Sequence, residues 1–316
     1  MRMSSFATYA RSLLLTLLLI LGGALALNVA VDPLWHFQGN RITGINIGFN
    51  ERVSKLNQAR RVVSTKNCVI YGSSRGTLLD GAFFAKSDCF NMAVSEGLAP
   101  EFPLYARALK SFGLKAGVVV INADDLSFFN PPNRSNAPVW LVRDSRAPEW
   151  WQDYVSLDAL QFSFRALAGK SPTPRYYRDD FSIAIEEGRR VYRPVNTDLV
   201  SLDTLPSERD RSQGRTAYPA FIDSYRALIA EHPAANVVVY IPPISIWRLA
   251  GMIRRGELSA YLESIHSLSA LGAPVLDFSV PSVLTTDATA TYDGSHFSLA
   301  SNRQVAALIE TPPEAG

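Results

Sequence analysis

The chain has 316 residues, of which 47% are hydrophobic and 19% are charged, so disorder is excluded as its main state. Lys and Arg number 31 against 29 Asp and Glu, and the formal net charge of +2 gives no electrostatic case for a nucleic-acid partner. With four histidines, two cysteines and no CxxC or HExxH spacing, we expect no metal site and no other cofactor.

The first predicted element is a helix over residues 12–31, an apolar run without any charge. About 20 helical residues at 1.5 Å each cross the roughly 30 Å hydrocarbon core of a bilayer. Arg2 and Arg11 precede the run and Asp32 follows it. The positive-inside rule therefore predicts that residues 1–11 stay in the cytoplasm and that the rest of the chain is exported.

A cleaved signal peptide is the alternative, because the small residues Ala24 and Ala26 could form a cleavage site. We favour an uncleaved anchor, since the run is longer than the apolar core of about 7–15 residues that is usual in a signal peptide. The sequence has no second apolar run of this length. The expected organisation is an anchor, a membrane-proximal linker over 32–66 and one domain over 67–316.

The exported part alternates between two kinds of segment. Short apolar runs typical of strands buried on both faces occupy residues 68–71, 89–93, 118–122, 236–241 and 273–278. Segments with helical periodicity occupy residues 103–112, 218–231, 257–271 and 302–310. This order predicts an α/β fold, a doubly wound three-layer α/β/α sandwich around a mostly parallel five-stranded sheet. In such sheets the functional groups gather at the carboxyl ends of the strands.

An insertion over about 126–214 interrupts the alternation. It is rich in Pro, Arg and aromatic residues, and residues 153–167 have a helical pattern. Long loops of this kind are often lids or binding surfaces, so the aromatic rings could stack on sugars. The simpler interpretation, which we favour, is that they fill a small core of their own. The aromatic residues concerned are Trp140, Trp150, Trp151, Tyr176, Tyr177 and Tyr192.

The two cysteines, Cys68 and Cys89, begin the first two predicted strands. If these strands are parallel neighbours, the two sulfur atoms can come within bonding distance. An exported domain permits a disulfide. The alternative is a pair of buried free thiols that pack as small apolar groups.

The first strand runs into Gly72-Ser73-Ser74-Arg75. Glycine allows a tight turn at the carboxyl edge of the sheet, and the hydroxyl groups that follow it face the crevice there. A serine in this place can act as a nucleophile if a base lies nearby, although serine is also common in turns for local reasons.

A second motif, Asp293-Gly294-Ser295-His296, lies between the last strand and the last helix. A carboxylate three residues before a histidine can bind one imidazole nitrogen and leave the other free to accept a proton. The alternative is a helix cap beside an incidental histidine. Because both motifs follow strands, we expect Ser74, His296 and Asp293 to converge at one edge of the sheet.

These two motifs resemble the SGNH (GDSL-type) hydrolase superfamily. The resemblance implies that Ser74 is the nucleophile and that Asp293 and His296 are its acid and base. With the N-terminal span, the motifs are similar to the membrane-anchored acyltransferase branch, which includes proteins of alginate acetylation and of D-alanyl transfer to teichoic acid. That branch implies a bacterial inner-membrane protein with a periplasmic body, and a multi-span membrane protein as acyl-donor partner.

Two further positions are suggested by the family as oxyanion donors, Gly97 after the second strand and Asn122 at the end of the third. The family pattern Gly-x-Asn-Asp is not matched here, since the chain reads Asn122-Ala123-Asp124-Asp125. Arg75 could bind an anionic group of a substrate or pair with Asp124 or Asp125. The ion pair is favoured, because arginine is seldom buried alone.

The expected function is therefore an exported, membrane-anchored serine acyl-transfer enzyme, either an O-acyltransferase or an esterase. Ser74 would take an acyl group from an ester donor and pass it to a glycan hydroxyl or to water. The alternative is a non-catalytic glycan-binding or scaffold subunit of a cell-envelope polysaccharide assembly, favoured by the imperfect third motif and the aromatic insertion.

Overall fold

The computed structural model describes residues 2–171, 175–178, 183–185 and 215–311. The chain divides into two compact units. Unit 1 comprises Met1–Gln58 and Arg143–Glu186, and unit 2 comprises Ala59–Val142 and Glu187–Gly316. Residues 32–58, expected as part of a linker, thus belong to a folded unit together with part of the insertion. The boundary between the units falls within helix α2 (Glu51–Val62).

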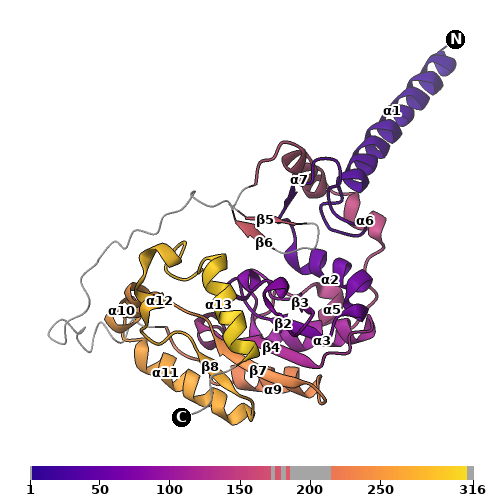
Figure 1. The fold of residues 1–316 in the computed structure, drawn as a ribbon. Coiled ribbons are helices and arrows are strands. Elements are labelled where there is room, and N and C mark those ends of the chain that lie inside the picture. The colour runs from indigo at the N-terminus through magenta and orange to yellow at the C-terminus, as the bar shows by residue number, and fades with distance from the viewer. Residues whose placement is uncertain (1, 172–174, 179–182, 186–214, 312–316) are drawn as a thin grey trace. The chain divides into compact units, whose positions relative to one another are not determined.

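Unit 2 is built on a parallel sheet. Among the described residues the sheet has five strands in the order β3-β2-β4-β7-β8, and every neighbouring pair is parallel (Figure 1). The bounds are Cys68–Tyr71 for β2, Cys89–Asn91 for β3, Val118–Asn122 for β4, Asn236–Ile241 for β7 and Val275–Asp277 for β8. The α/β fold is confirmed, and the sheet is parallel throughout.

Helices cover both faces of this sheet. Ile70 and Val120 share a buried cluster with Ile309 of α13. Tyr71 points to the opposite face, because side chains alternate along a strand, and its ring lies 6.3 Å from that of Phe102 in α3. The main helices of unit 2 are α3 (Phe102–Ser111), α9 (Phe221–Ala230), α10 (Ile246–Arg254), α11 (Leu258–Ser267) and α13 (Leu299–Glu310), with short helices α4 (Asp125–Phe128), α5 (Val139–Val142) and α12 (Val283–Thr286).

The strand order determines where a site can form. The chain passes from β2 outward to β3, then returns across β2 to β4 and continues away from it. The direction of winding therefore reverses between β2 and β4. In open parallel sheets, a crevice forms at the carboxyl ends of the two strands where the winding reverses.

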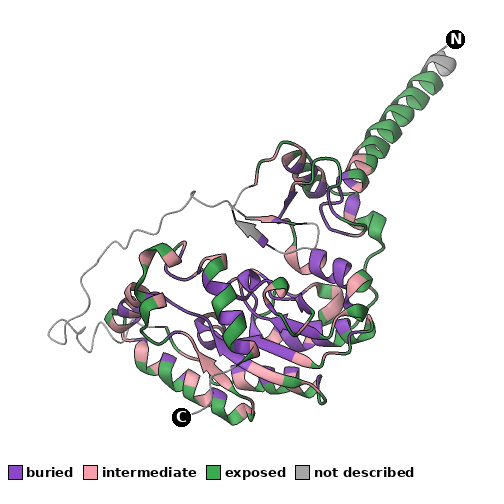
Figure 2. Ribbon diagram, viewed as in Figure 1, coloured by how far each residue is buried: buried purple, intermediate pink, exposed green. Residues whose placement is uncertain are grey.

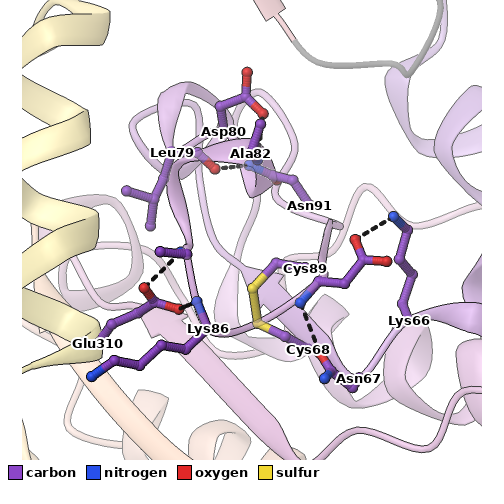
Figure 3. The surroundings of a disulfide bond; sticks show 12 residues. Lys66, Asn67, Cys68, Leu79, Asp80, Ala82, Lys86, Cys89, Asn91 and Glu310 are labelled. Atoms are coloured by element: carbon purple, nitrogen blue, oxygen red, sulfur yellow. Dashed lines mark hydrogen bonds and ion pairs between the residues drawn. A yellow bond between two sulfur atoms is a disulfide. The ribbon is translucent and has the colours of Figure 1, made fainter.

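A disulfide joins Cys68 of β2 to Cys89 of β3, which are partners in the register of the two strands (Figure 3). Next to it, Lys66 forms an ion pair with Asp88 at 2.5 Å, and the Asp88 N–H donates to the side chain of Asn67 at 2.8 Å. These contacts join the amino ends of β2 and β3, at the end of β2 opposite to the Gly72-Ser73-Ser74 turn.

Unit 1 begins with the long helix α1 (Arg2–Val31). Its segment Phe6–Val31 has a mean hydropathy of 2.4, long and apolar enough to cross a membrane, and it is mostly exposed (Figure 2). Its last turns pack on α7 (Leu157–Leu167), which follows α6 (Trp150–Tyr154). A small antiparallel sheet in the order β1-β5-β6 completes the unit, with bounds Asn46–Ile47, Arg175–Tyr177 and Ile183–Ile185.

The aromatic residues of the insertion make mainly packing contacts. The Trp150 ring lies 5.7 Å from that of Phe37, and Tyr176 packs on the cluster around Val31. Tyr177 is buried, and Trp140 lies under the guanidinium of Arg60, 5.8 Å from the ring centroid. Trp151 is exposed, and Tyr192 lies outside the described residues.

Candidate active site

The turn after β2 presents Ser74 at the carboxyl edge of the sheet. A Cβ atom on Gly72 would lie 2.4 Å from the Asn122 Cβ atom, so only glycine fits against the end of β4 here. The chain then turns through Ser73, which is buried, and Ser74, which is partly exposed. The local sequence thus brings the backbone close to β4 and leaves one hydroxyl accessible.

The second motif is a tight loop between η7 (Ala288–Ala290) and α13. One carboxylate oxygen of Asp293 accepts the backbone N–H groups of Ser295 at 2.9 Å and His296 at 2.8 Å. Gly294 has φ +80°, a left-handed conformation that favours glycine. Tyr292 N–H donates to the His296 carbonyl at 2.8 Å and closes the loop.

The two motifs meet in space. His296 Nε2 lies 2.8 Å from Ser74 Oγ, and His296 Nδ1 lies 2.7 Å from Asp293 Oδ2. A carboxylate that accepts the Nδ1–H proton leaves Nε2 with a free lone pair that can take the serine proton. The geometry is that of a nucleophile, a base and an orienting acid in hydrogen-bonded sequence.

Asp293 is held in its ionised form. Burial alone would raise the pKa of its carboxyl, but the hydrogen bond from the His296 side chain and those from the His296 and Ser295 backbones lower that pKa well below its ordinary value. Asp293 therefore stays negative over the whole neutral range, next to the imidazole that it orients.

Ser73, next to Ser74, holds the turn against the end of β4 by hydrogen bonds. The Ser73 N–H donates to Asn122 Oδ1 at 3.0 Å, and its hydroxyl donates to Asp124. Asp124 also caps α4 by accepting the Leu126 N–H at 3.1 Å. Burial, opposed by the charge of Arg75, raises the pKa of Asp124 above its ordinary value.

Arg75 is buried and joins the two motifs. Its guanidinium forms an ion pair with Asp125 at 2.5 Å, lies 3.4 Å from Asp124, and donates through Nε to Ser295 Oγ at 2.7 Å. Burial would lower the pKa of Arg75, but the carboxylates of Asp125 and Asp124 outweigh it and raise that pKa. The structure thus places Arg75 in the expected ion pair.

The ion pair continues into a network that no sequence motif indicates. Arg215 donates to Asp125 at 3.0 Å and to Glu257 at 3.2 Å, and it lies over the Phe129 ring. Burial would raise the pKa of Glu257, but hydrogen bonds from Arg255 and Arg215 lower it to about 2. Arg215 and Glu257 lie in no recognisable motif, and their pairing depends on tertiary structure.

The two suggested oxyanion donors are placed differently. Asn122 Oδ1 accepts from Ser73, which fixes the amide orientation, and its buried Nδ2 group has no hydrogen-bond partner among the described residues. By contrast, the Gly97 N–H donates to the Val94 carbonyl at 2.9 Å. A Cβ atom on Gly97 would lie 2.4 Å from the Gly72 carbonyl, so Gly97 allows a close approach of backbone rather than offering a donor.

In the described part of the chain, no three His, Cys, Asp or Glu side chains are grouped to hold a metal ion. No protein-family model matches the chain, and no curated protein matches it either. Its function is therefore inferred from the geometry of Ser74, His296 and Asp293.

Proposed function

We propose that this protein is an exported, membrane-anchored serine acyl-transfer enzyme of the SGNH type. The observation that carries the proposal is the continuous contact from Ser74 Oγ through His296 to Asp293, with distances of 2.8 and 2.7 Å. The three residues come from two loops that are more than two hundred positions apart, and they meet at the edge of a parallel sheet where function is expected.

In the first half of the reaction, Ser74 Oγ attacks the ester carbonyl carbon while His296 Nε2 takes the serine proton. The tetrahedral intermediate collapses, the bond to the leaving oxygen breaks, and that oxygen takes the proton from His296. The products are the alcohol of the donor and an acyl ester on Ser74. Asp293 holds the imidazole in place and stabilises its charged form.

In the second half, His296 takes a proton from a glycan hydroxyl or from water, and the resulting oxygen attacks the acyl ester. Collapse releases Ser74, which regains its proton from His296. The oxyanion of both intermediates is assigned to the unpartnered Nδ2 group of Asn122 and to the Ser74 N–H, which makes no hydrogen bond within the described residues. Removal of one such donor costs about 10²–10³ in rate in other enzymes.

We further propose that α1 anchors the enzyme in a bacterial inner membrane with the body in the periplasm. The support is the apolar segment Phe6–Val31 and the arginines before it. The resemblance of the motifs to anchored acyltransferases supports a glycan acceptor and a multi-span donor protein as partner.

Ser74→Ala tests the proposed chemistry. The variant should lose turnover of p-nitrophenyl acetate, because it lacks the hydroxyl that lies within hydrogen-bond distance of His296 Nε2. Ser259→Ala, which removes an exposed hydroxyl on α11, is the matched control and should turn over like the native protein. Turnover by the Ser74 variant at the native rate would refute the assignment.

One observation favours the second candidate, a non-catalytic glycan-binding or scaffold subunit. The Gly97 N–H is hydrogen-bonded to the Val94 carbonyl, so the site has one oxyanion donor fewer than the family pattern supplies. If the native protein binds polysaccharide but neither hydrolyses aryl esters nor reacts with a fluorophosphonate, this second function is the correct one.

A further inference from the structure

The last turns of α1 are part of the folded core of unit 1. Asn28 is fully buried, donates through Nδ2 to the Tyr154 carbonyl at 2.8 Å and accepts from Ser163 Oγ at 2.8 Å. Asp32, directly after the helix, accepts the backbone N–H groups of residues 37–39 and the Tyr154 hydroxyl. The carboxyl end of α1 is therefore part of the packed interior of unit 1 and is not a flexible linker to it.

The turn between α6 and α7 lies against the last turns of α1. Tyr154, just before the turn, accepts from Asn28 through its carbonyl at 2.8 Å. Ala159, just after the turn, shares a buried cluster with Leu25, Val29 and Leu34. Residues 155–158, which join them, therefore lie beside the last turns of α1.

These contacts place the turn between α6 and α7 close to the level at which α1 enters unit 1. Ala24 and Leu25 are the first residues of the helix that unit 1 partly covers, and Leu25 belongs to the cluster of Ala159.

The free length of α1 is too short to hold this turn away from a bilayer. Residues 12–23 are exposed, and unit 1 begins to cover the helix at Ala24. Those residues span about 18 Å at 1.5 Å each, and about 27 Å if the span starts at Phe6. Both values fall short of a hydrocarbon core of about 30 Å.

The side chains at this level suit a lipid surface. Leu157 is 83% exposed, Val155 55% and Trp151 48%, an unusual set for a turn in water. Ser156 and Asp158, also exposed, suit the headgroup region. Tryptophan is enriched at this depth because its ring is apolar and its N–H is polar.

We propose that unit 1 is seated in the leaflet that it adjoins, with Trp151, Val155 and Leu157 inserted among the lipid headgroups and upper acyl chains. We call this set the α6–α7 corner. The proposal rests on the membrane anchor and is independent of the acyl-transfer chemistry. Its occupant is lipid, because the corner lies at the level where α1 itself leaves the bilayer.

Site-specific labelling tests this seating. Both native cysteines are in the disulfide, so Leu157→Cys introduces a single free thiol for a polarity-sensitive nitrobenzoxadiazole label. The full chain is reconstituted in phosphatidylethanolamine and phosphatidylglycerol vesicles. The matched control is Ala168→Cys, an exposed position at the other end of α7, about 16 Å further along its axis.

The label at 157 should emit as in an apolar medium, lose most of its emission to spin-labelled lipid and resist aqueous iodide, whereas the label at 168 should behave in the opposite way. Equal access of iodide to both labels overturns the seating but leaves the anchor. A label at 157 shielded from both quenchers indicates coverage by protein and also overturns it. Failure to float with vesicles overturns the anchor and the seating together.

A second measurement avoids any labelled variant. In the native protein, brominated lipid should quench part of the tryptophan emission, and Trp151→Phe should remove most of that part. A quenched fraction that is unchanged in the variant contradicts the proposal.

Discussion

At the residue scale, Arg75 makes a second contact between the two motifs of the candidate site, beside the hydrogen bond from Ser74 to His296. It is adjacent to Ser74 in sequence and donates to Ser295, which is adjacent to His296. Its charge is balanced by Asp125 and Asp124, so its position is fixed within a buried network. Arg75 thus links the turn that carries Ser74 to the loop that carries His296.

This role predicts coupled effects. Arg75→Lys and Ser295→Ala should each lower kcat by about 10- to 100-fold and leave KM nearly unchanged, because a misplacement near 1 Å is costly to reacting groups. The double variant should be no slower than the slower of the two single variants, since both substitutions remove the same contact between Arg75 and Ser295. Steady-state kinetics with p-nitrophenyl acetate measures kcat for the native protein, the two single variants and the double variant. If the two losses in kcat multiply in the double variant, Arg75 does not act through Ser295.

Glu257 allows a test of the same network by pH. Its pKa falls from 4.5 to about 2 in the folded protein, so the unfolded chain takes up its proton first as the pH drops. Its stabilisation is therefore complete above about pH 4.5 and is lost toward pH 2.

Glu257→Gln should lower the free energy of unfolding at pH 7 by about 1.5–3 kcal/mol, the usual worth of hydrogen bonds to a charged group. The difference from the native protein should shrink as the pH falls below about 4.5. Urea unfolding at a series of pH values measures this difference, with Glu263→Gln, an exposed position in α11, as control. A difference that is constant with pH would contradict the account.

At the scale of elements, the carboxyl ends of β2 and β4 form the site by close packing. Gly72 lies so near Asn122 that a Cβ atom on it would be 2.4 Å from the Asn122 Cβ. Any larger residue must push the end of β4, and with it Asn122, away from the turn that carries Ser74.

Gly72→Ala should therefore lower the free energy of unfolding by about 1–3 kcal/mol, the usual cost of overpacking, and reduce esterase activity as well. Gly117→Ala is the matched control, since a Cβ at the other end of β4 would meet nothing nearer than 3.7 Å. Thermal unfolding and aryl-ester turnover measure both effects. Equal behaviour of the two variants would mean that the contact between Gly72 and Asn122 is not restrictive.

The strands of the sheet were predictable because their apolar, β-branched runs are continuous: residues 68–71, 118–122 and 236–241 match the structure exactly in their bounds. Two helices were not predictable in the same way. The helix α2 is largely polar and has no clear apolar period. The helix α10 has an apolar period, but it is short and follows two prolines. Ser245, which caps α10, was a further local signal for it.

Some features of the candidate site could likewise be predicted from the sequence, and others could not. The Ser74 and His296 motifs are local in sequence and could be identified, and the parallel sheet explains why they converge. The pairing of Arg215 with Glu257 depends on a contact between distant segments, and the engaged Gly97 N–H depends on the turn that residues 94–97 adopt in the fold. No spacing in the sequence encodes these contacts.

At the scale of the whole molecule, each unit carries one of the two features on which the proposals rest. Unit 1 holds the carboxyl end of α1 through Asn28 and Asp32, and unit 2 carries Ser74, His296 and Asp293. If both proposals hold, the chemistry takes place on a body that is fixed at a membrane surface.

The central claim is that Ser74 is a nucleophile activated by His296. The most direct measurement is peptide mapping by mass spectrometry after treatment of the full chain with a fluorophosphonate, together with the His296→Ala variant. We predict a stoichiometric adduct on Ser74 in the native protein and a greatly slowed reaction in the variant. No adduct on Ser74, or an adduct that forms equally fast without His296, would contradict the account.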